Sequence, residues 1–340
     1  DLGWEQSHQT DFGLDFGFFG NSLQLTADYF YKRTEGMLQV MPVPTYLGES
    51  KPWGNVGEMS NSGIELDMNY RYSIGDFNFS IGANATYIKT ILINAGNETG
   101  ILDGGSFHQM GTITRGQNGM VYPYFYGYKT DGVFQNWDEV KSYVGADGSL
   151  IQPSAQPGDF RYQDLDGDGK ITAEGDRTNL GKCVPAWTYG VNASIDWKGI
   201  DFSMVWQGVA GNKIFDGTRR TDIPTMNQPK YVLNRWTGEG STNAYPRFTT
   251  TDPNQNWSKA SDFFIKDASY FRLKNITLGY TLPYNWTKKV FVKKLRVYVA
   301  AENLLTLTKY DGFDPEIAGY MDRGIYPQAR TFQFGASITF

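Results

Sequence analysis

The dominant feature of this sequence is a strict alternation of apolar and polar side chains that recurs in long runs. In the run at 23–32, leucine, alanine and tyrosine alternate with Gln24, Thr26 and Asp28. Such alternation gives a β-strand one apolar and one polar face, because successive side chains point to opposite sides. The sequence therefore predicts an all-β, antiparallel fold. Nine runs of this kind occur, at 10–19, 23–32, 63–72, 77–87, 188–197, 201–208, 271–282, 295–303 and 331–340.

One run changes phase partway along. Phe271 and Leu273 fall on one parity, whereas Ile276, Leu278 and Tyr280 fall on the other. A β-bulge inserts one residue and would restore a single apolar face. We expect a bulge in this strand.

The length of the runs and the spacing between them favour a transmembrane β-barrel. Most runs last about ten residues, roughly twice the common strand length, and about 9–11 tilted residues cross a bilayer core. The connections also alternate between short turns and long loops, which is typical of membrane barrels with extracellular loops. The long connections are expected at about 34–60, 91–187, 211–268 and 304–329.

A soluble β-sandwich or propeller also alternates in this way. The one-sided turn lengths favour the membrane barrel, and so do aromatic residues near the run ends, where interfacial girdles lie. These aromatics are Phe18, Phe19, Tyr29, Tyr31, Tyr70, Tyr72, Trp197 and Phe340. Phe340 ends an amphipathic run, as in the signal by which bacterial outer-membrane barrels are recognised for insertion. It is our candidate barrel-assembly signal.

Composition argues against several other classes of protein. The net charge of −5 and the pI of about 5.2 argue against nucleic acid as a partner. No apolar stretch approaches the ~18 residues of a membrane helix. His8 and His108 are the only histidines, and Cys183 is the only cysteine. Neither a nucleophile elbow nor a phosphate-binding loop occurs, and no carboxylate pair stands out as a glycosidase site. We therefore predict that the chain is not an enzyme.

The segment "DLDGDGKITAEGD" at 164–176 resembles the first half of a calcium-binding loop. Alternate carboxylates, a glycine for the sharp turn and a backbone carbonyl suit the oxygen preference of calcium. The twelfth position is Gly175, so Asp176 is expected to close the site in preference to Glu174. The flanking residues are not helical, and a solvated acidic turn is the alternative. The hypothesis is one structural calcium held by Asp164, Asp166, Asp168, the carbonyl of Lys170, and Asp176.

Several segments together resemble the SusC/RagA family of TonB-dependent outer-membrane transporters of Bacteroidetes. They are "WEQSHQTDFGLDFGFFGNSLQLTADYFYKRTEGML", "YGYKTDGVFQNWDEV", "PGDFRYQDLDGDGKITAEGDRTNLGK", "YFRLKNITLGYTLP" and "LRVYVAAENLLTLTKYDGFDPE". The resemblance covers nearly all 340 residues. It implies the C-terminal strands of a 22-stranded barrel, without the plug domain, the TonB box and the first strands. In the family the acidic loop closes one residue earlier than at Asp176.

The resemblance also implies a function. The family imports oligosaccharides or peptides across the bacterial outer membrane, with a SusD-like lipoprotein over the mouth and TonB pulling the plug. Loop aromatics could contact the substrate or the lipoprotein, or fill loop cores. The alternative function is a soluble, calcium-stabilised carbohydrate-binding β-domain. The aromatic candidates are Tyr122, Tyr124, Trp137, Trp187, Trp236 and Trp257.

Overall fold

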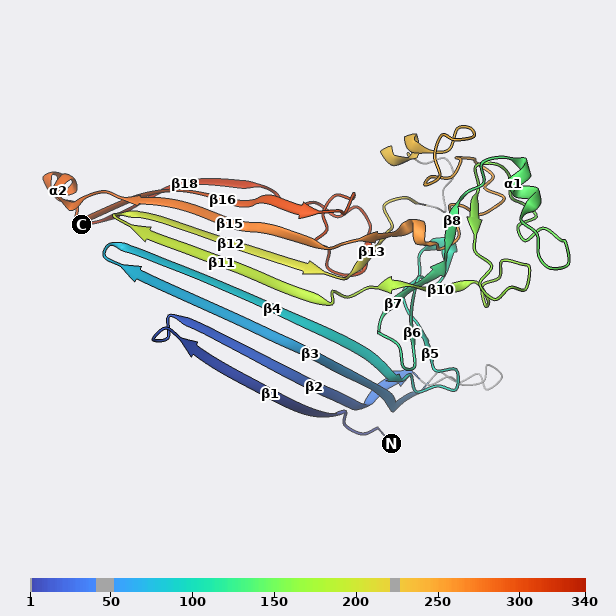
Figure 1. Cartoon of the computed structure of the whole chain (residues 1–340), viewed down its shortest axis with the longest axis horizontal. Coiled ribbons are helices and arrows are strands. Elements are labelled where there is room, and N and C mark those ends of the chain that lie inside the picture. The colour runs from blue at the N-terminus through green and yellow to red at the C-terminus, as the bar shows by residue number, and fades with distance from the viewer. Residues whose placement is uncertain (1, 41–51, 221–226) are drawn as a thin grey trace.

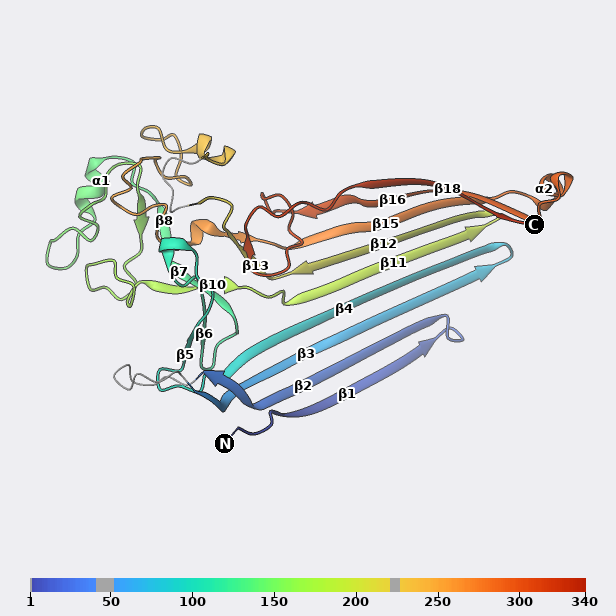
Figure 2. The same cartoon turned by 180° about the vertical axis from the view of Figure 1, so that it is seen from behind.

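A nine-stranded antiparallel sheet is the largest element of the structure, a computed structural model that describes residues 2–40, 52–220 and 227–340. Every strand pairs with the next long strand in the chain, so the sheet is an up-and-down meander (Figures 1 and 2). Each of the nine alternating runs forms one strand, which confirms the prediction. In spatial order the strands are β1 (Gln6–Phe18), β2 (Leu23–Val40), β3 (Trp53–Ile74), β4 (Phe77–Asn94), β11 (Trp187–Trp197), β12 (Ile200–Ala210), β15 (Tyr270–Thr281), β16 (Lys294–Thr308) and β18 (Thr331–Thr339).

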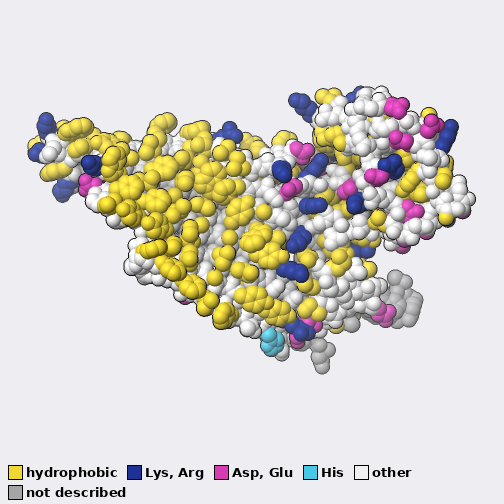
Figure 3. All heavy atoms as spheres, viewed as in Figure 1, with side chains coloured by type: hydrophobic (Ala, Val, Ile, Leu, Met, Phe, Trp, Pro, Cys, Tyr) yellow, Lys and Arg dark blue, Asp and Glu magenta, His cyan; other side chains and the backbone are white. Residues whose placement is uncertain are grey.

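The strand register aligns the apolar side chains of neighbouring strands on one face. Because paired residues point to the same side, the side chains of each row across the sheet are either mainly apolar or mainly polar. One apolar row consists of Phe16, Leu25, Met68, Ala83, Val191, Trp206, Leu273 and Leu305. The adjacent row on the other face consists of Asp15, Thr26, Asp67, Asn84, Gly190, Gln207, Arg272 and Thr306. Figure 3 shows the apolar face as a continuous yellow surface over the strands.

The expected bulge lies at Lys274 in β15. On the β12 side, Val205 pairs with Asn275 and Trp206 pairs with Leu273, which leaves Lys274 as the extra residue. The pairing with β16 is interrupted at the same place. The bulge puts Leu273 on the same apolar face as Ile276, Leu278 and Tyr280, as the phase change in the sequence predicted.

Several strands extend beyond their alternating runs, and β2, β3 and β4 do so most. β2, β3 and β4 contain 18, 22 and 18 residues. The predicted loop 34–60 was therefore wrong at both ends, since 34–40 and 53–60 are strand; residues 41–51 lie outside the described residues. The alternation fades because the register shifts around Gly36, which has a φ of 67°. The other long connections lie at 95–186, 211–269 and 309–330, close to the prediction.

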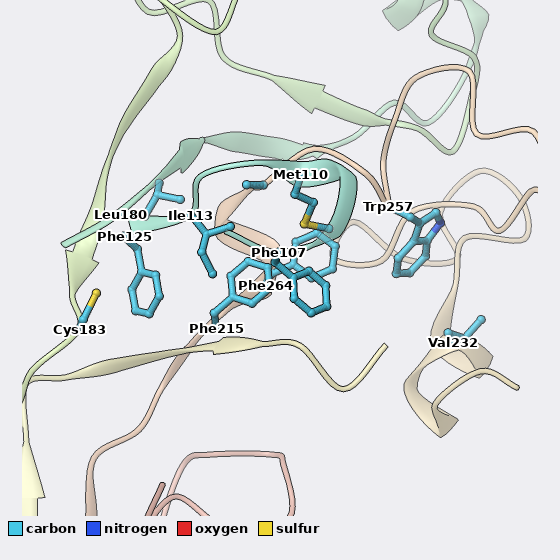
Figure 4. Packing of buried hydrophobic residues seen from close by; sticks show 11 residues of the cluster. Phe107, Met110, Ile113, Phe125, Leu180, Cys183, Phe215, Val232, Trp257 and Phe264 are labelled. Carbon is cyan, nitrogen blue, oxygen red and sulfur yellow. The ribbon is translucent and has the colours of Figure 1, made fainter. Parts of the chain in front are cut away.

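The three described long connections fold together beyond one end of the sheet (Figures 1 and 2). We call this part the loop assembly. Its main core is aromatic and joins connections 95–186 and 211–269, as Figure 4 shows for Phe125, Phe215 and Trp257. The small elements of the assembly are β5 (Ile101–Asp103), η2 (His108–Met110), β6 (Thr114–Gln117), β7 (Tyr124–Tyr128), β8 (Thr130–Val133), α1 (Trp137–Ser142), β9 (Phe160–Tyr162), β10 (Arg177–Lys182), β13 (Lys213–Asp216), η3 (Lys230–Asn234), η4 (Asp262–Phe264), β14 (Ile265–Asp267) and β17 (Met321–Asp322).

The opposite end of the sheet carries the short turns. The connection between β15 and β16 is the exception, because it contains α2 (Tyr284–Thr287) and η5 (Lys288–Val290). Among the described residues, no helix has the length and apolar character needed to cross a membrane.

The two faces of β11 offer a direct test of the sheet's environment. Val191 lies at the middle of the strand on the apolar face, and Asn192 follows on the polar face. Val191→Arg should lower the free energy of unfolding in lipid vesicles by about 2–4 kcal/mol, because the guanidinium would face hydrocarbon. Asn192→Arg is the matched control and should lower the free energy of unfolding much less. Equal losses for the two variants in an equilibrium unfolding assay would contradict the assignment of the faces.

Candidate functional site

The acidic segment forms a tight loop that gathers three carboxylates. Asp164, Asp166 and Asp168 each place one oxygen within 4.8 Å of the others. The backbone N–H groups of Gly167 and Gly169 donate to the two oxygens of Asp164 at 2.7 and 2.9 Å. Both glycines have positive φ, 75° and 81°, which a residue with a side chain adopts at a cost. The sequence thus predicted this cluster correctly.

Asp176 closes the loop by hydrogen bonding. Its side chain is fully buried. Its Oδ1 accepts the Leu165 N–H at 2.7 Å, and its Oδ2 accepts the Thr172 N–H at 2.6 Å. Lys170 donates its own N–H to Asp168 Oδ1 at 2.8 Å. Within the described part of the chain, the group of converging carboxylates therefore comprises the three exposed or half-buried aspartates without Asp176.

The twelfth loop position, Gly175, lies directly against the Asp166 carboxylate. A Cβ at Gly175 would lie 2.0 Å from Asp166 Oδ2, so the Asp166 carboxylate occupies the space where a closing side chain would stand. Three carboxylates at this separation repel one another unless a cation neutralises them. Their oxygens are the donors that a hard cation such as calcium prefers.

Two of the six candidate contact aromatics are buried. Tyr124 and Trp257 are 2% and 3% exposed, so neither side chain faces solvent. Trp257 belongs to the main core of the loop assembly, and its indole N–H donates to the Arg247 carbonyl oxygen at 3.3 Å. Both residues fill loop cores, which is the alternative that the sequence left open.

The other four aromatics have different surroundings. Trp187 lies on the apolar face of the sheet, with its ring centroid 5.0 Å from that of Tyr87. Tyr122 and Trp236 are partly buried. Trp137, at the start of α1, is 53% exposed and remains available for contact with another molecule.

A pocket of about 490 Å³ opens between connections 211–269 and 309–330. Its aromatic lining residues are Tyr231, Tyr245, Tyr310 and Phe313, and the rings of Tyr231 and Tyr245 lie 6.2 Å apart at 30°. The Tyr231 hydroxyl is buried without a hydrogen-bond partner in the described structure. Burial raises the pKa of Tyr231, so the hydroxyl remains a neutral donor. The charged and amide side chains in the lining are Asp216, Lys230, Asn234, Lys266 and Asp311.

The sequence did not predict this pocket. Its residues come from two connections that lack alternation, and their proximity depends on how the loops pack. The signal available was the mixture of aromatic and charged residues near Tyr231 and Phe313. Such a lining suits a ligand with both apolar surface and hydrogen-bonding groups.

A buried ion pair joins two of the connections. Arg247 donates from Nε and Nη2 to the two oxygens of Asp159 at 2.6 and 3.2 Å, and the Asp159 side chain is fully buried. Asn256 Nδ2 also donates to Asp159 Oδ1 at 2.8 Å. This network holds connection 95–186 against connection 211–269.

A second network ties connection 309–330 to the polar face of β15. Arg272 donates to Asp314 at 2.6 Å and to Glu316 at 2.7 Å, and Lys274 donates to the Glu316 carboxylate at 2.7 Å. Burial alone would raise the pKa of Asp314, but the hydrogen bonds from Arg272 and from the backbone lower it below its usual value. The resulting stabilisation is present above the ordinary carboxyl pKa of about 4 and is lost as the pH falls through the lower folded value.

The comparison with known protein families decides the identity of the sheet. A family model described as "TonB dependent receptor-like, beta-barrel" matches residues 1–304.

The chain belongs to the TonB-dependent receptor β-barrel family.

Its relatives are receptors and transporters. TonB-dependent receptor P3 of Formosa agariphila is 32% identical over 358 residues, which cover 100% of this chain and 34% of the relative. TonB-dependent receptor SusC of Bacteroides thetaiotaomicron is 26% identical, over 100% of this chain and 32% of the relative. The structure of the RagAB peptide importer in the "open-open" state matches with a TM-score of 0.79 and 25% identity, over 100% of this chain and 35% of that chain. The chain thus spans about a third of the length of these relatives.

Family membership gives the two faces of the sheet their environments. TonB-dependent receptor barrels lie in the outer membrane, so the apolar face is the lipid-facing one and the polar face lines the interior. The resemblance to SusC and RagA is confirmed, and the barrel is favoured over a soluble β-domain. The relatives are not enzymes, which confirms that prediction as well.

The Asp159–Arg247 pair generates a prediction about the rigidity of the loop assembly. Arg247→Met should leave the Asp159 carboxylate buried without its cation and destabilise the assembly locally by about 3 kcal/mol. Hydrogen–deuterium exchange of the amides at 133–160 measures this opening. Arg161→Met is the matched control, because Arg161 pairs with the exposed Asp131. This substitution should lower the local stability by less than about 1 kcal/mol. If both variants exchange like the wild type, Asp159–Arg247 does not hold the loops together.

Proposed function

We propose that this chain forms part of the wall and the external loops of an active importer in the bacterial outer membrane. The importer takes up an oligosaccharide or a peptide nutrient and depends on TonB for energy. A SusD-like lipoprotein covers the extracellular mouth and meets the loop assembly. The long connections face the outside of the cell in this proposal, and the short turns face the periplasm.

The observation that carries the proposal is the polar inner face, which continues across the sheet. Charged side chains there need water or polar cargo, since an unpaired charge in an apolar environment is costly. A hollow of about 610 Å³ on the inner face of β1–β4 is lined by both acidic and basic groups. Its polar lining residues are Gln9, Asp11, Asp28, Lys32, Asn61 and Glu65.

The sheet also needs partners at its edges. β1 and β18 end the strand order, and a strand edge that faces hydrocarbon leaves backbone N–H and C=O groups without partners. We propose that further strands of a 22-stranded barrel pair with both edges. The plug and the contact with TonB belong to the whole transporter in this proposal. The barrel-assembly role of Phe340 stays a prediction; the residue follows β18 and is 75% exposed.

We assign substrate contact to the pocket lined by Tyr231, Tyr245 and Phe313. The neutral Tyr231 hydroxyl has no partner in the described structure and can donate to a carbonyl or hydroxyl oxygen of a ligand. The aromatic rings can stack on a sugar ring or on an apolar side chain. SusC and the RagAB peptide importer support transport as the shared activity. Trp137, exposed at the far side of the loop assembly, is our candidate contact for the lipoprotein.

An uptake assay in the source bacterium tests this function. A strain that lacks the full-length protein should lose uptake of one labelled class, oligosaccharide or peptide, and a protonophore should abolish that uptake in the wild type. Complementation with Phe313→Ala should raise the apparent KM about two- to tenfold, since an aromatic contact contributes about 0.5–1.5 kcal/mol. Phe313 is 66% exposed, so its removal should leave folding intact.

Tyr326→Ala is the matched control for this assay. Tyr326 is 90% exposed but does not line the pocket, so uptake should be unchanged. Unimpaired uptake of both classes in the deletion strain would contradict the importer. If Phe313→Ala shows wild-type uptake kinetics, only the assignment of substrate contact to this pocket is contradicted.

We also propose that Asp164, Asp166 and Asp168 hold one structural calcium. The support is the convergence of three carboxylates on a loop whose glycines and hydrogen bonds fix its shape. The Lys170 carbonyl adds a backbone ligand in this proposal, and Asp176 holds the loop closed through its hydrogen bonds from Leu165 and Thr172. Calcium there would stiffen connection 95–186 and perform no chemistry.

Removing two ligands tests the calcium site. Asp166→Ala together with Asp168→Ala should abolish calcium binding by isothermal titration calorimetry, with a wild-type Kd of about 10⁻⁴–10⁻³ M expected for an extracellular module. It should also speed amide exchange across 164–176 and leave the barrel folded. Glu174→Ala removes an acid of the same loop outside the cluster and should preserve binding. Absence of calcium binding by the wild-type protein would end this proposal.

A further inference from the structure

The connection between β15 and β16 differs from the other turns at its end of the sheet. Those turns comprise only residues 19–22, 75–76 and 198–199. The segment 282–293 instead builds α2 and η5, which project beyond the strand ends next to the C-terminus (Figure 1). A short hairpin would connect the two strands equally well. The additional residues therefore call for another role.

Backbone hydrogen bonds fix this segment on the ends of the strands. Leu282 donates its N–H to Leu295 at 2.9 Å, and Lys293 donates to Thr339 at 2.8 Å. Val292 donates to the Thr287 carbonyl oxygen at 3.2 Å. The Thr287 side chain is buried at the centre of the turn. The segment is thus an ordered structure with a defined outer surface.

That outer surface combines apolar and cationic side chains. Its large exposed apolar residues are Tyr284 at 60%, Trp286 at 62%, Val290 at 65% and Phe291 at 90% exposure. Three exposed lysines lie among them, and none forms a salt bridge with a described residue: Lys288, Lys289 and Lys293. The stretch 282–296 contains no acidic residue. Figure 3 shows dark blue side chains gathered with yellow ones at this end of the molecule.

The surface is continuous with the lipid-facing face of the sheet. The apolar row nearest to it contains Ile200, Tyr280 and Val297, followed by Leu295 paired with Ile338. Segment 282–293 begins where this face ends, at the level of the membrane–water interface. Aromatic rings are favourable at that level, and lysines near it attract anionic lipid headgroups.

We propose that residues 282–293 form a docking surface for anionic phospholipids of the leaflet at the short-turn end. Trp286 and Phe291 insert between headgroups and acyl chains, and the lysine ammonium groups pair with lipid phosphates. The surface would anchor this end of the barrel wall at a fixed depth. The inference rests on the membrane location of the family and is independent of the proposed cargo.

Lipid selectivity in reconstituted vesicles tests the proposal. The full-length transporter is placed in phosphatidylcholine vesicles with trace spin-labelled phosphatidylglycerol or phosphatidylcholine, and the immobilised fraction of each label is measured. Wild type should immobilise phosphatidylglycerol several-fold more than phosphatidylcholine. Changing Lys288, Lys289 and Lys293 to glutamine should bring this ratio close to one. Changing them to arginine should preserve it, because the charge is retained.

A charge-matched variant separates local from general effects. Glutamine at three exposed lysines of the loop assembly removes the same charge far from this surface and should keep the wild-type ratio: Lys129, Lys141 and Lys309. An unchanged ratio in the 288/289/293 glutamine variant would overturn the proposal. The proposal would also be overturned if the glutamine variant kept its lipid selectivity but lost binding to a periplasmic protein. The surface would then serve a protein partner.

Discussion

The fold depends on one constraint: inside a hydrocarbon layer, every backbone N–H and C=O group must find its partner within the protein. A continuous antiparallel ladder satisfies this along each strand. The ladder then separates two solvents, lipid on one side and a polar interior on the other. Apolar and polar side chains must therefore alternate along each strand, as Val191 and Asn192 do in β11. The constraint acts on local sequence, which is why all nine strands could be predicted from alternation alone.

The same reasoning explains where the sequence was insufficient. Beyond the bilayer both faces of β2, β3 and β4 meet a polar environment, so alternation is no longer required. The strands continue there through a register shift at Gly36, and the ion pair of Arg33 with Glu35 at 2.9 Å replaces apolar contacts. Strand ends in this region could not be predicted. The bulge at Lys274 could, because within the membrane an extra residue must restore the phase.

The loop assembly follows a different principle, since its structure depends on contacts between residues far apart in sequence. The acidic cluster was predictable because its three aspartates lie within five residues of one another. The hydrogen-bonding role of Asp176, the burial of Trp257 and the Asp159–Arg247 pair were not, because each depends on packing between connections. The same aromatic residue types fill cores and line pockets. Only the folded arrangement distinguishes Trp257 from Phe313.

The two ends of the sheet therefore gain their order from different sources. At the loop end, buried aromatic clusters and ion pairs hold the chain without help from the membrane. At the turn end, segment 282–293 has backbone hydrogen bonds but a single fully buried side chain, Thr287, and it presents Trp286 and Phe291 outward. Fixing backbone costs conformational entropy, and exposing large rings to water forgoes their burial. An ordered turn of this kind is stabilised only where another surface covers the rings of Trp286 and Phe291. At this level of the barrel, the adjoining surface is the membrane interface.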